Sequence, residues 1–146
     1  MSGDGKRHVV SVELEVPFHD VDSLNIVWHG HYYKYLEIAR TALMRSVELD
    51  NDQIRALGCG LVMGETQCKH TGVLRYGDKL RVDAWFKDVT QRLCIAYEVR
   101  KLTSGVRAAR ARTVLVTLNG RGELNLETPA EVVARITEKT GPLTVG

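Results

Sequence analysis

The start of the chain alternates between apolar and polar residues. Segment 9–16 places its two kinds of side chain on opposite faces: Val10, Val12, Leu14 and Val16 on one, and Ser11, Glu13 and Glu15 on the other. A period of two is typical of a half-buried β-strand. Pro17 should end this strand, because proline cannot donate a ladder hydrogen bond. Residues 1–7 are polar and contain glycine, which predicts a frayed N-terminus.

The pattern changes to helical spacing near residue 32. Apolar side chains then recur every three or four positions: Tyr32, Tyr35, Leu36, Ala39, Leu43 and Val47. This spacing predicts a long helix over about residues 30–48, with an apolar face broad enough to need cover on more than one side. A short second helix is expected at 51–57, closed by Gly58. The segment between strand and helix, 19–31, is rich in His and Asp without a clear period, so it is predicted to be a loop.

The rest of the chain favours strands. Expected strands include a short apolar run at 61–64, an extended segment at 65–74, two alternating segments at 80–87 and 93–100, and a long strand at 106–118. Turns are expected at 103–105 and 119–122. The sequence Thr128-Pro129-Ala130-Glu131 resembles a capping box with proline at the first helical position, which predicts a terminal helix reaching about Lys139.

This order of elements indicates an α+β fold in a single domain over residues 1–146. The apolar face of a sheet needs cover, and the long helix is the only large element that can provide it. We therefore expect a curved antiparallel sheet wrapped around one long central helix. The chain has no internal repeat, low-complexity segment or domain linker.

Composition narrows the class of protein. The 146 residues are 44% hydrophobic and 26% charged, which is ordinary for a globular protein, and the net charge is +2. So even a balance argues against nucleic acid or an anionic membrane as the main partner. No apolar stretch is long enough for a signal peptide or a membrane span. Three cysteines without CxxC spacing give neither a disulfide framework nor a zinc site, and reduced thiols fit a cytoplasmic location.

The polar loop before the long helix carries the candidate chemistry. Five side chains gather there: His19, Asp20, Asp22, His29 and His31. A helix N-terminus offers unpaired N–H groups and a partial positive charge, so it can bind an oxyanion or polarise a carbonyl. A carboxylate beside such a site could act as a general base or as a nucleophile. The helix start lacks an obvious Ser or Thr cap, which fits N–H groups left for a substrate.

Other readings of the same residues remain open. Either aspartate could cap N–H groups of the loop, and the histidines could hydrogen-bond within the turn. The set matches no standard metal pattern, so we expect no metal and no cofactor. The aromatic residues of the segment would then be core and pocket wall, and the arginines of the 107–121 region a solvated surface unless a phosphorylated ligand is present. The chain has no GxSxG, P-loop or GxGxxG motif.

Residues 16–40, VPFHDVDSLNIVWHGHYYKYLEIAR, resemble the hydroxybenzoyl-CoA thioesterase family and the related Tol–Pal-associated acyl-CoA thioesterases. The matching motif elements are, in order, Phe18, Asp20, Asp22, Val27, Trp28, His29, Tyr32, Tyr35, Glu37, Ala39 and Arg40. The β-rich remainder, including YGDKLRVDAWF, is also similar to this family. The resemblance therefore extends over nearly the whole chain, and the N-terminal motif is its most specific part.

The resemblance implies a hotdog fold and assigns roles to individual residues. Asp22, the second aspartate of the Asp-x-Asp pair, would be the catalytic carboxylate. The thioester carbonyl would lie at the backbone N–H groups of His29 and Gly30, and a glycine there would permit close approach and unusual backbone angles. Substrate contacts would come from two groups of side chains: Trp28, His31 and Tyr32 near the thioester, and Arg75, Arg107, Arg110 and Arg112 at the CoA phosphates.

The implied function is hydrolysis of an acyl-CoA thioester to a free acid and CoA, by a homodimer or homotetramer with active sites at subunit interfaces. An acyl-carrier-protein thioesterase and a non-catalytic acyl-thioester-binding protein are the alternatives. The sequence departs from the family at Leu24-Asn25, where relatives have two small residues, at His31, and in lacking a proline within 70–75. These departures bear on acyl specificity and on the shape of the pocket mouth.

Overall fold

Five antiparallel strands form one sheet in the computed structural model, which describes residues 8–143. The strands are β1 (Val9–Glu15), β2 (Gly60–His70), β3 (Lys79–Asp88), β4 (Leu93–Lys101) and β5 (Arg107–Leu118). Their order across the sheet is β1-β3-β4-β5-β2, so β1 and β2 are the edges. The frayed segment predicted at residues 1–7 lies outside the described residues.

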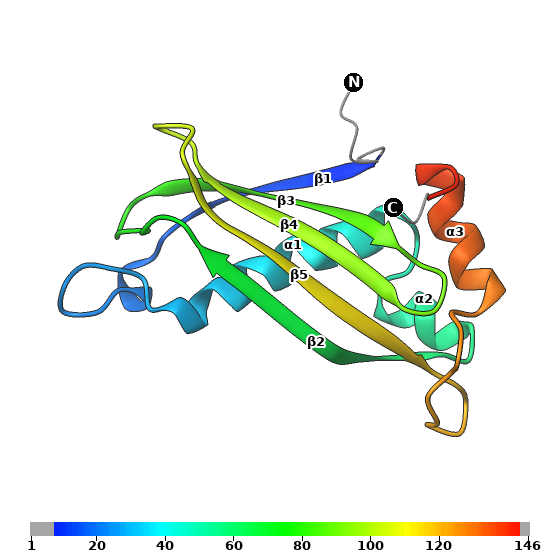
Figure 1. Ribbon diagram of the computed structural model, residues 1–146. Coiled ribbons are helices and arrows are strands. Elements are labelled where there is room, and N and C mark those ends of the chain that lie inside the picture. The colour runs from blue at the N-terminus through cyan, green and yellow to red at the C-terminus, as the bar shows by residue number, and fades with distance from the viewer. Residues whose placement is uncertain (1–7, 144–146) are drawn as a thin grey trace.

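The long helix α1 (Tyr32–Ser46) lies along one face of this sheet, against β1 and β3, and the sheet curves around it (Figure 1). One stripe of α1 is buried: Tyr32, Tyr35, Leu36, Ala39, Leu43 and Met44. The strands supply the other half of the core from their alternating positions, including Leu80, Val82, Phe86, Ile95 and Val99. Because a period of 3.6 and a period of two each place apolar residues on one side, the two elements bury each other. The predicted architecture of a sheet around one helix is confirmed.

Short elements complete the chain. Two 3-10 turns flank the polar loop, η1 (Phe18–Asp20) and η2 (His29–His31), and η2 leads directly into α1. The second helix, α2 (Asn51–Ala56), begins with a capping box between Asp50 and Gln53. Gly58 follows it with a φ of 73°, a conformation that glycine adopts without steric cost. The predicted short helix closed by this glycine is confirmed.

The predicted capping box at the last helix is wrong. Helix α3 runs over Ala130–Thr140, and Pro129, with ψ of 141°, is its N-cap rather than its first residue. Thr128 is therefore one position too early to cap. Its backbone N–H donates to the Thr90 carbonyl, and its buried hydroxyl has no hydrogen-bond partner within residues 8–143.

Strand β2 joins two segments that the sequence suggested were separate. The ladder between β2 and β5 shifts between Met63 and Glu65, and a β-bulge at Gly64 absorbs the break in alternation. The strand ends at His70, because Thr71 and Gly72 both donate their N–H groups to the Ala108 carbonyl and the chain turns there. Most side chains of β2 are exposed, and within residues 8–143 the strand pairs on one side only.

Candidate active site

The loop that carries Asp22 is closed by its own backbone. Val21 and Val27 form an isolated antiparallel bridge, and the Asp22 N–H donates to the Ile26 carbonyl at 3.0 Å. The exposed Asp22 carboxylate accepts N–H bonds from Leu24 (2.8 Å) and Ile26 (3.3 Å), both on Oδ1. Its Oδ2 has no hydrogen bond in the described part of the chain. One oxygen thus shapes the loop, while the other is available for chemistry.

Asp20 has a different environment. It is 1% exposed, and its oxygens accept hydrogen bonds of 2.6 Å from Lys34 Nζ and from the Tyr35 hydroxyl. Burial acts to raise the pKa of this carboxyl, but the bonds from Lys34 and Tyr35 outweigh it and hold the pKa below its usual range. Asp20 therefore ties the loop to the first turns of α1 and caps no helix.

The helix start has no side-chain cap. Trp28 precedes η2 and His31 precedes α1, and neither side chain makes a capping hydrogen bond. The N–H groups of His31 and Tyr32 donate to the carbonyls of Trp28 and His29. The N–H groups of His29 and Gly30 lie ahead of the first acceptors in the turn, so a ligand can use them. This is the uncapped start that the sequence predicted.

Gly30 is needed for a reason other than the expected one. Its φ is not positive, so the prediction of unusual backbone angles is wrong. Instead, the six-membered ring of the Trp28 indole occupies the space where a Cβ on Gly30 would lie. Any side chain at this position would have to displace the indole, which is 56% exposed.

A ring cluster lines this end of α1. The Trp28 indole packs against His29 and His31, with ring centroids 5.0 and 5.5 Å apart. Beneath them, the His70 ring meets Tyr32 edge to face at 4.4 Å and lies 6.2 Å from the His29 ring. Burial, and secondarily the charge of His29, lowers the pKa of His70. Sequence reasoning gave His70 no role, because no local pattern links the end of β2 to the helix start.

The predicted substrate-binding residues of the loop differ in exposure. Tyr32 is 2% exposed, and burial raises the pKa of its hydroxyl to about 12. The His31 Nδ1 atom lies 3.8 Å from Asp20 Oδ1, so this imidazole faces the buried carboxylate. Trp28 and His29 are exposed. Within one chain, these two present the more accessible surface to a substrate.

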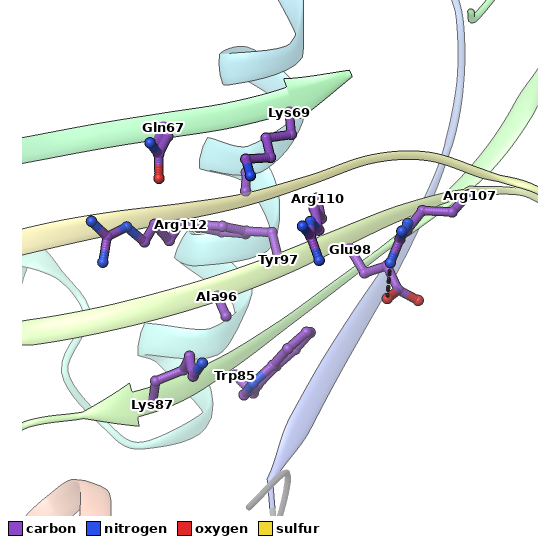
Figure 2. A pocket seen from close by; sticks show the side chains of 11 residues that line it. Gln67, Lys69, Trp85, Lys87, Ala96, Tyr97, Glu98, Arg107, Arg110 and Arg112 are labelled. Carbon is purple, nitrogen blue, oxygen red and sulfur yellow. Dashed lines mark ion pairs between the residues drawn. The ribbon is translucent and has the colours of Figure 1, made fainter. Parts of the chain in front are cut away.

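The predicted phosphate-binding arginines separate into two places. Arg107, Arg110 and Arg112 of β5 surround a hollow of about 360 Å³ on the sheet face opposite α1 (Figure 2). Arg75 lies in the loop after β2, which contacts the Asp22 loop through two bonds. The Val27 N–H donates to the Leu74 carbonyl at 2.8 Å, and the Tyr76 N–H donates to Asn25 Oδ1 at 3.3 Å. Only Arg75 therefore belongs to the surroundings of Asp22 within one chain.

Three other features limit the chemistry. Within residues 8–143, no group of three or more His, Cys, Asp or Glu side chains is placed to hold a metal ion. Cys59, Cys68 and Cys94 are free thiols. No helix between residues 8 and 143 is both long enough and apolar enough to cross a bilayer.

Comparison with known proteins identifies the family. Residues 16–136 match the model of the thioesterase-like superfamily. A Bacillus subtilis protein with the provisional name of an acyl-CoA thioesterase is 27% identical over 81 residues, which are 56% of this chain and 59% of that protein. A chloroplastic acyl-acyl carrier protein thioesterase from Arabidopsis thaliana is 29% identical over 82 residues, which are 56% of this chain and 43% of the relative.

A solved structure gives the fold. The 1,4-dihydroxy-2-naphthoyl-CoA thioesterase from Synechocystis aligns with a TM-score of 0.76 and 20% identity, over 92% of this chain and 100% of that one. The matched family segment contains the Asp-x-Asp loop, α1 and all strands after β1. The chain therefore belongs to the thioesterase-like superfamily and has the hotdog fold that its N-terminal motif predicted.

Proposed function

We propose that this protein is an acyl-CoA thioesterase and that Asp22 drives the hydrolysis. One observation carries the assignment of Asp22: a rigid loop holds its carboxylate by Oδ1 alone, next in the chain to an uncapped helix start. Family membership supports the reaction type. The chain spans 59% of the Bacillus subtilis relative, so acyl-CoA as the substrate belongs to the proposal.

The geometry divides the reaction between two groups. The N–H groups of His29 and Gly30 would donate to the thioester carbonyl oxygen and stabilise the negative charge that develops there. Asp22 Oδ2 would either take a proton from the attacking water or attack the carbonyl carbon itself. In both routes water supplies the new oxygen of the acid, and the thiolate leaves and takes up a proton. Both routes remain open.

Trp28 and Arg75 would contact the rest of the substrate. The exposed Trp28 indole covers Gly30, so it would form one wall of the carbonyl site. Arg75 is exposed in the loop bonded to the Asp22 loop, and its guanidinium fork suits a phosphate group. We expect Arg75→Gln to raise KM for an acyl-CoA more than for a pantetheine thioester.

We also propose a homodimer formed through β2. This edge strand has eleven residues against seven in β1, and it exposes Val62 and Met63. An exposed apolar edge of this length needs a partner strand, and a second copy can supply it by two-fold antiparallel pairing. Since His70 ends β2 beside Tyr32, such pairing would bring the partner subunit close to the helix start. The cytoplasmic location and a tetramer stay predictions.

The similarity to an acyl-acyl carrier protein thioesterase favours one second candidate, hydrolysis of a carrier-bound thioester. The same Asp22 and helix start would serve, and the two substrates differ only in what carries the thiol. Parallel assays with acyl-CoA and with an acyl carrier protein thioester decide between them. A kcat/KM at least about tenfold higher for the carrier-bound substrate would favour the second candidate.

Asp22→Asn is the variant that tests the central assignment. Asparagine keeps a side-chain oxygen that can accept the N–H groups of Leu24 and Ile26, so the loop should hold its shape. It removes the charge, so kcat should fall by a factor of about a hundred or more while KM changes little. Asp22→Ala loses both loop bonds and is the less informative variant. Turnover by Asp22→Asn within about twofold of wild type would refute the assignment.

A further inference from the structure

A hollow on the sheet face opposite α1 gathers cations from three strands (Figure 2). Its lining contains five basic side chains, namely Lys69 of β2, Lys87 of β3, and Arg107, Arg110 and Arg112 of β5. Glu98 is the only acidic residue that lines it. The small side chains of Ala96 and Ala111 leave room at its base, next to the indole of Trp85.

The acidic residues nearby do not neutralise this hollow. Glu98 accepts a 2.6 Å hydrogen bond from Arg100 Nε and lies 3.8 Å from Arg107 Nη1, so it is already engaged. Glu65 pairs with Arg112 at 3.4 Å. Three of the lining cations form no ion pair within residues 8–143: Lys69, Lys87 and Arg110. Like charges gathered without counterions repel one another, so an anionic ligand would be favoured.

Size and charge together decide the kind of occupant. A second copy packed on this face through a two-fold axis would set the cations against themselves, which is unfavourable. A concave volume of about 360 Å³ lies instead in the range of small-molecule sites. Ammonium groups supply point charges, and guanidinium forks can hold two phosphate oxygens each.

We propose that this hollow binds a phosphorylated small molecule. Two sources share that chemistry. One is the phosphoadenosine end of an acyl-CoA whose thioester occupies the Asp22 site, and this source rests on the proposed function. The other is a separate phosphorylated ligand that binds independently of catalysis. The site itself lies on the sheet face opposite α1 in either case.

Titration of the full-length protein with adenosine 3′,5′-bisphosphate tests the site. In a Trp28→Phe background, Trp85 is the single tryptophan, so its fluorescence reports occupancy of the hollow. The Lys69→Gln/Arg110→Gln double variant should weaken binding about tenfold or more, since it removes two charge-assisted contacts. Arg55→Gln, on the exposed α2 helix, is the matched control and should leave binding unchanged. Thermal unfolding checks that each variant folds.

The same titration can overturn the proposal. A bisphosphate that binds no better than uncharged adenosine would refute it, and so would equal affinity in the double variant and the wild type. Binding should also weaken steeply as salt is raised, because exposed charges are screened.

Kinetics then separate the two sources. If the substrate's nucleotide end fills the hollow, the double variant raises KM for acyl-CoA, spares an acyl-pantetheine, and the bisphosphate competes with acyl-CoA. If the ligand is separate, both KM values stay unchanged and the bisphosphate still binds Asp22→Asn protein saturated with acyl-CoA. Each result supports the site and names its source. Failure of the Asp22 assignment would leave the bisphosphate titration unaffected, so the two proposals fail separately.

Discussion

The Tyr35 hydroxyl donates a 2.6 Å hydrogen bond to Oδ2 of Asp20, and both residues are buried. The partners are 15 residues apart, one at the end of η1 and the other in the first turn of α1. Lys34 holds the other carboxylate oxygen at the same distance. This bond therefore anchors the chain entering the Asp22 loop to the helix whose N-terminus forms the other half of the candidate site.

Tyr35→Phe should destabilise the fold by about 1–3 kcal/mol, because it leaves a buried carboxylate oxygen without a donor. Urea unfolding monitored by circular dichroism measures the change. Tyr33→Phe is the matched control, since Tyr33 is 41% exposed and should shift the free energy of unfolding by less than about 0.5 kcal/mol. Equal effects of the two variants would contradict a special role for the buried bond.

Asp20 should make stability fall in acid. Its folded pKa lies below the ordinary value of 3.8, so its stabilising effect is complete above that value and is lost as pH falls through the folded pKa. The difference in unfolding free energy between wild type and Asp20→Asn should therefore shrink as pH falls below 3.8. Urea titrations from about pH 7 to about pH 2 would measure it. A difference that stays constant with pH would mean that the folded pKa of Asp20 is not depressed.

Gly30→Ala should lower kcat by a factor of up to about a hundred, because the new Cβ displaces the Trp28 indole and shifts the carbonyl site. The explanation requires that the two residues act through each other. In a Trp28→Ala background, the same Gly30→Ala change should cost little further activity. A cost that is the same in both backgrounds would mean that the Cβ obstructs the substrate directly.

His70 should titrate below its ordinary pKa of 6.5, because burial and the nearby His29 both disfavour its charged form. Its imidazole would then be neutral at pH 7 beside the helix start. NMR titration of the ring protons measures the midpoint. His29→Ala removes one of the two causes, so the His70 midpoint should rise toward 6.5 in that variant. A midpoint in wild type at or above 6.5 would contradict this account.

Val62→Lys should shift the assembly toward monomer if β2 pairs with a second copy. Val62 is 42% exposed on the β2 edge, and Val9→Lys is the matched control, at 41% exposure on the opposite edge β1. Sedimentation velocity at micromolar concentration should give a dimer for wild type and for Val9→Lys. A monomeric wild type would refute the proposed assembly, and dissociation by Val9→Lys alone would move the interface to β1.

Local pattern determined most of the fold. The two-residue period of β1, β3 and β4 and the helical spacing of α1 were readable because each element buries one face, which imposes a repeat on neighbouring residues. The errors fall where no such repeat exists. The β-bulge at Gly64 interrupted the pattern of β2, and a shift of one residue at Pro129 removed the predicted cap of α3.

The sequence by itself also gave the family, because the Asp-x-Asp loop and α1 are contiguous and their order survives as a motif. Only the tertiary structure decided how those residues are used. It separated two similar aspartates by burial, Asp20 in the core and Asp22 exposed. It brought His70 to the helix start, and it moved the β5 arginines to the far face of the sheet. These relationships join residues distant in sequence, and strand register and helix packing set them, so no local pattern encodes them.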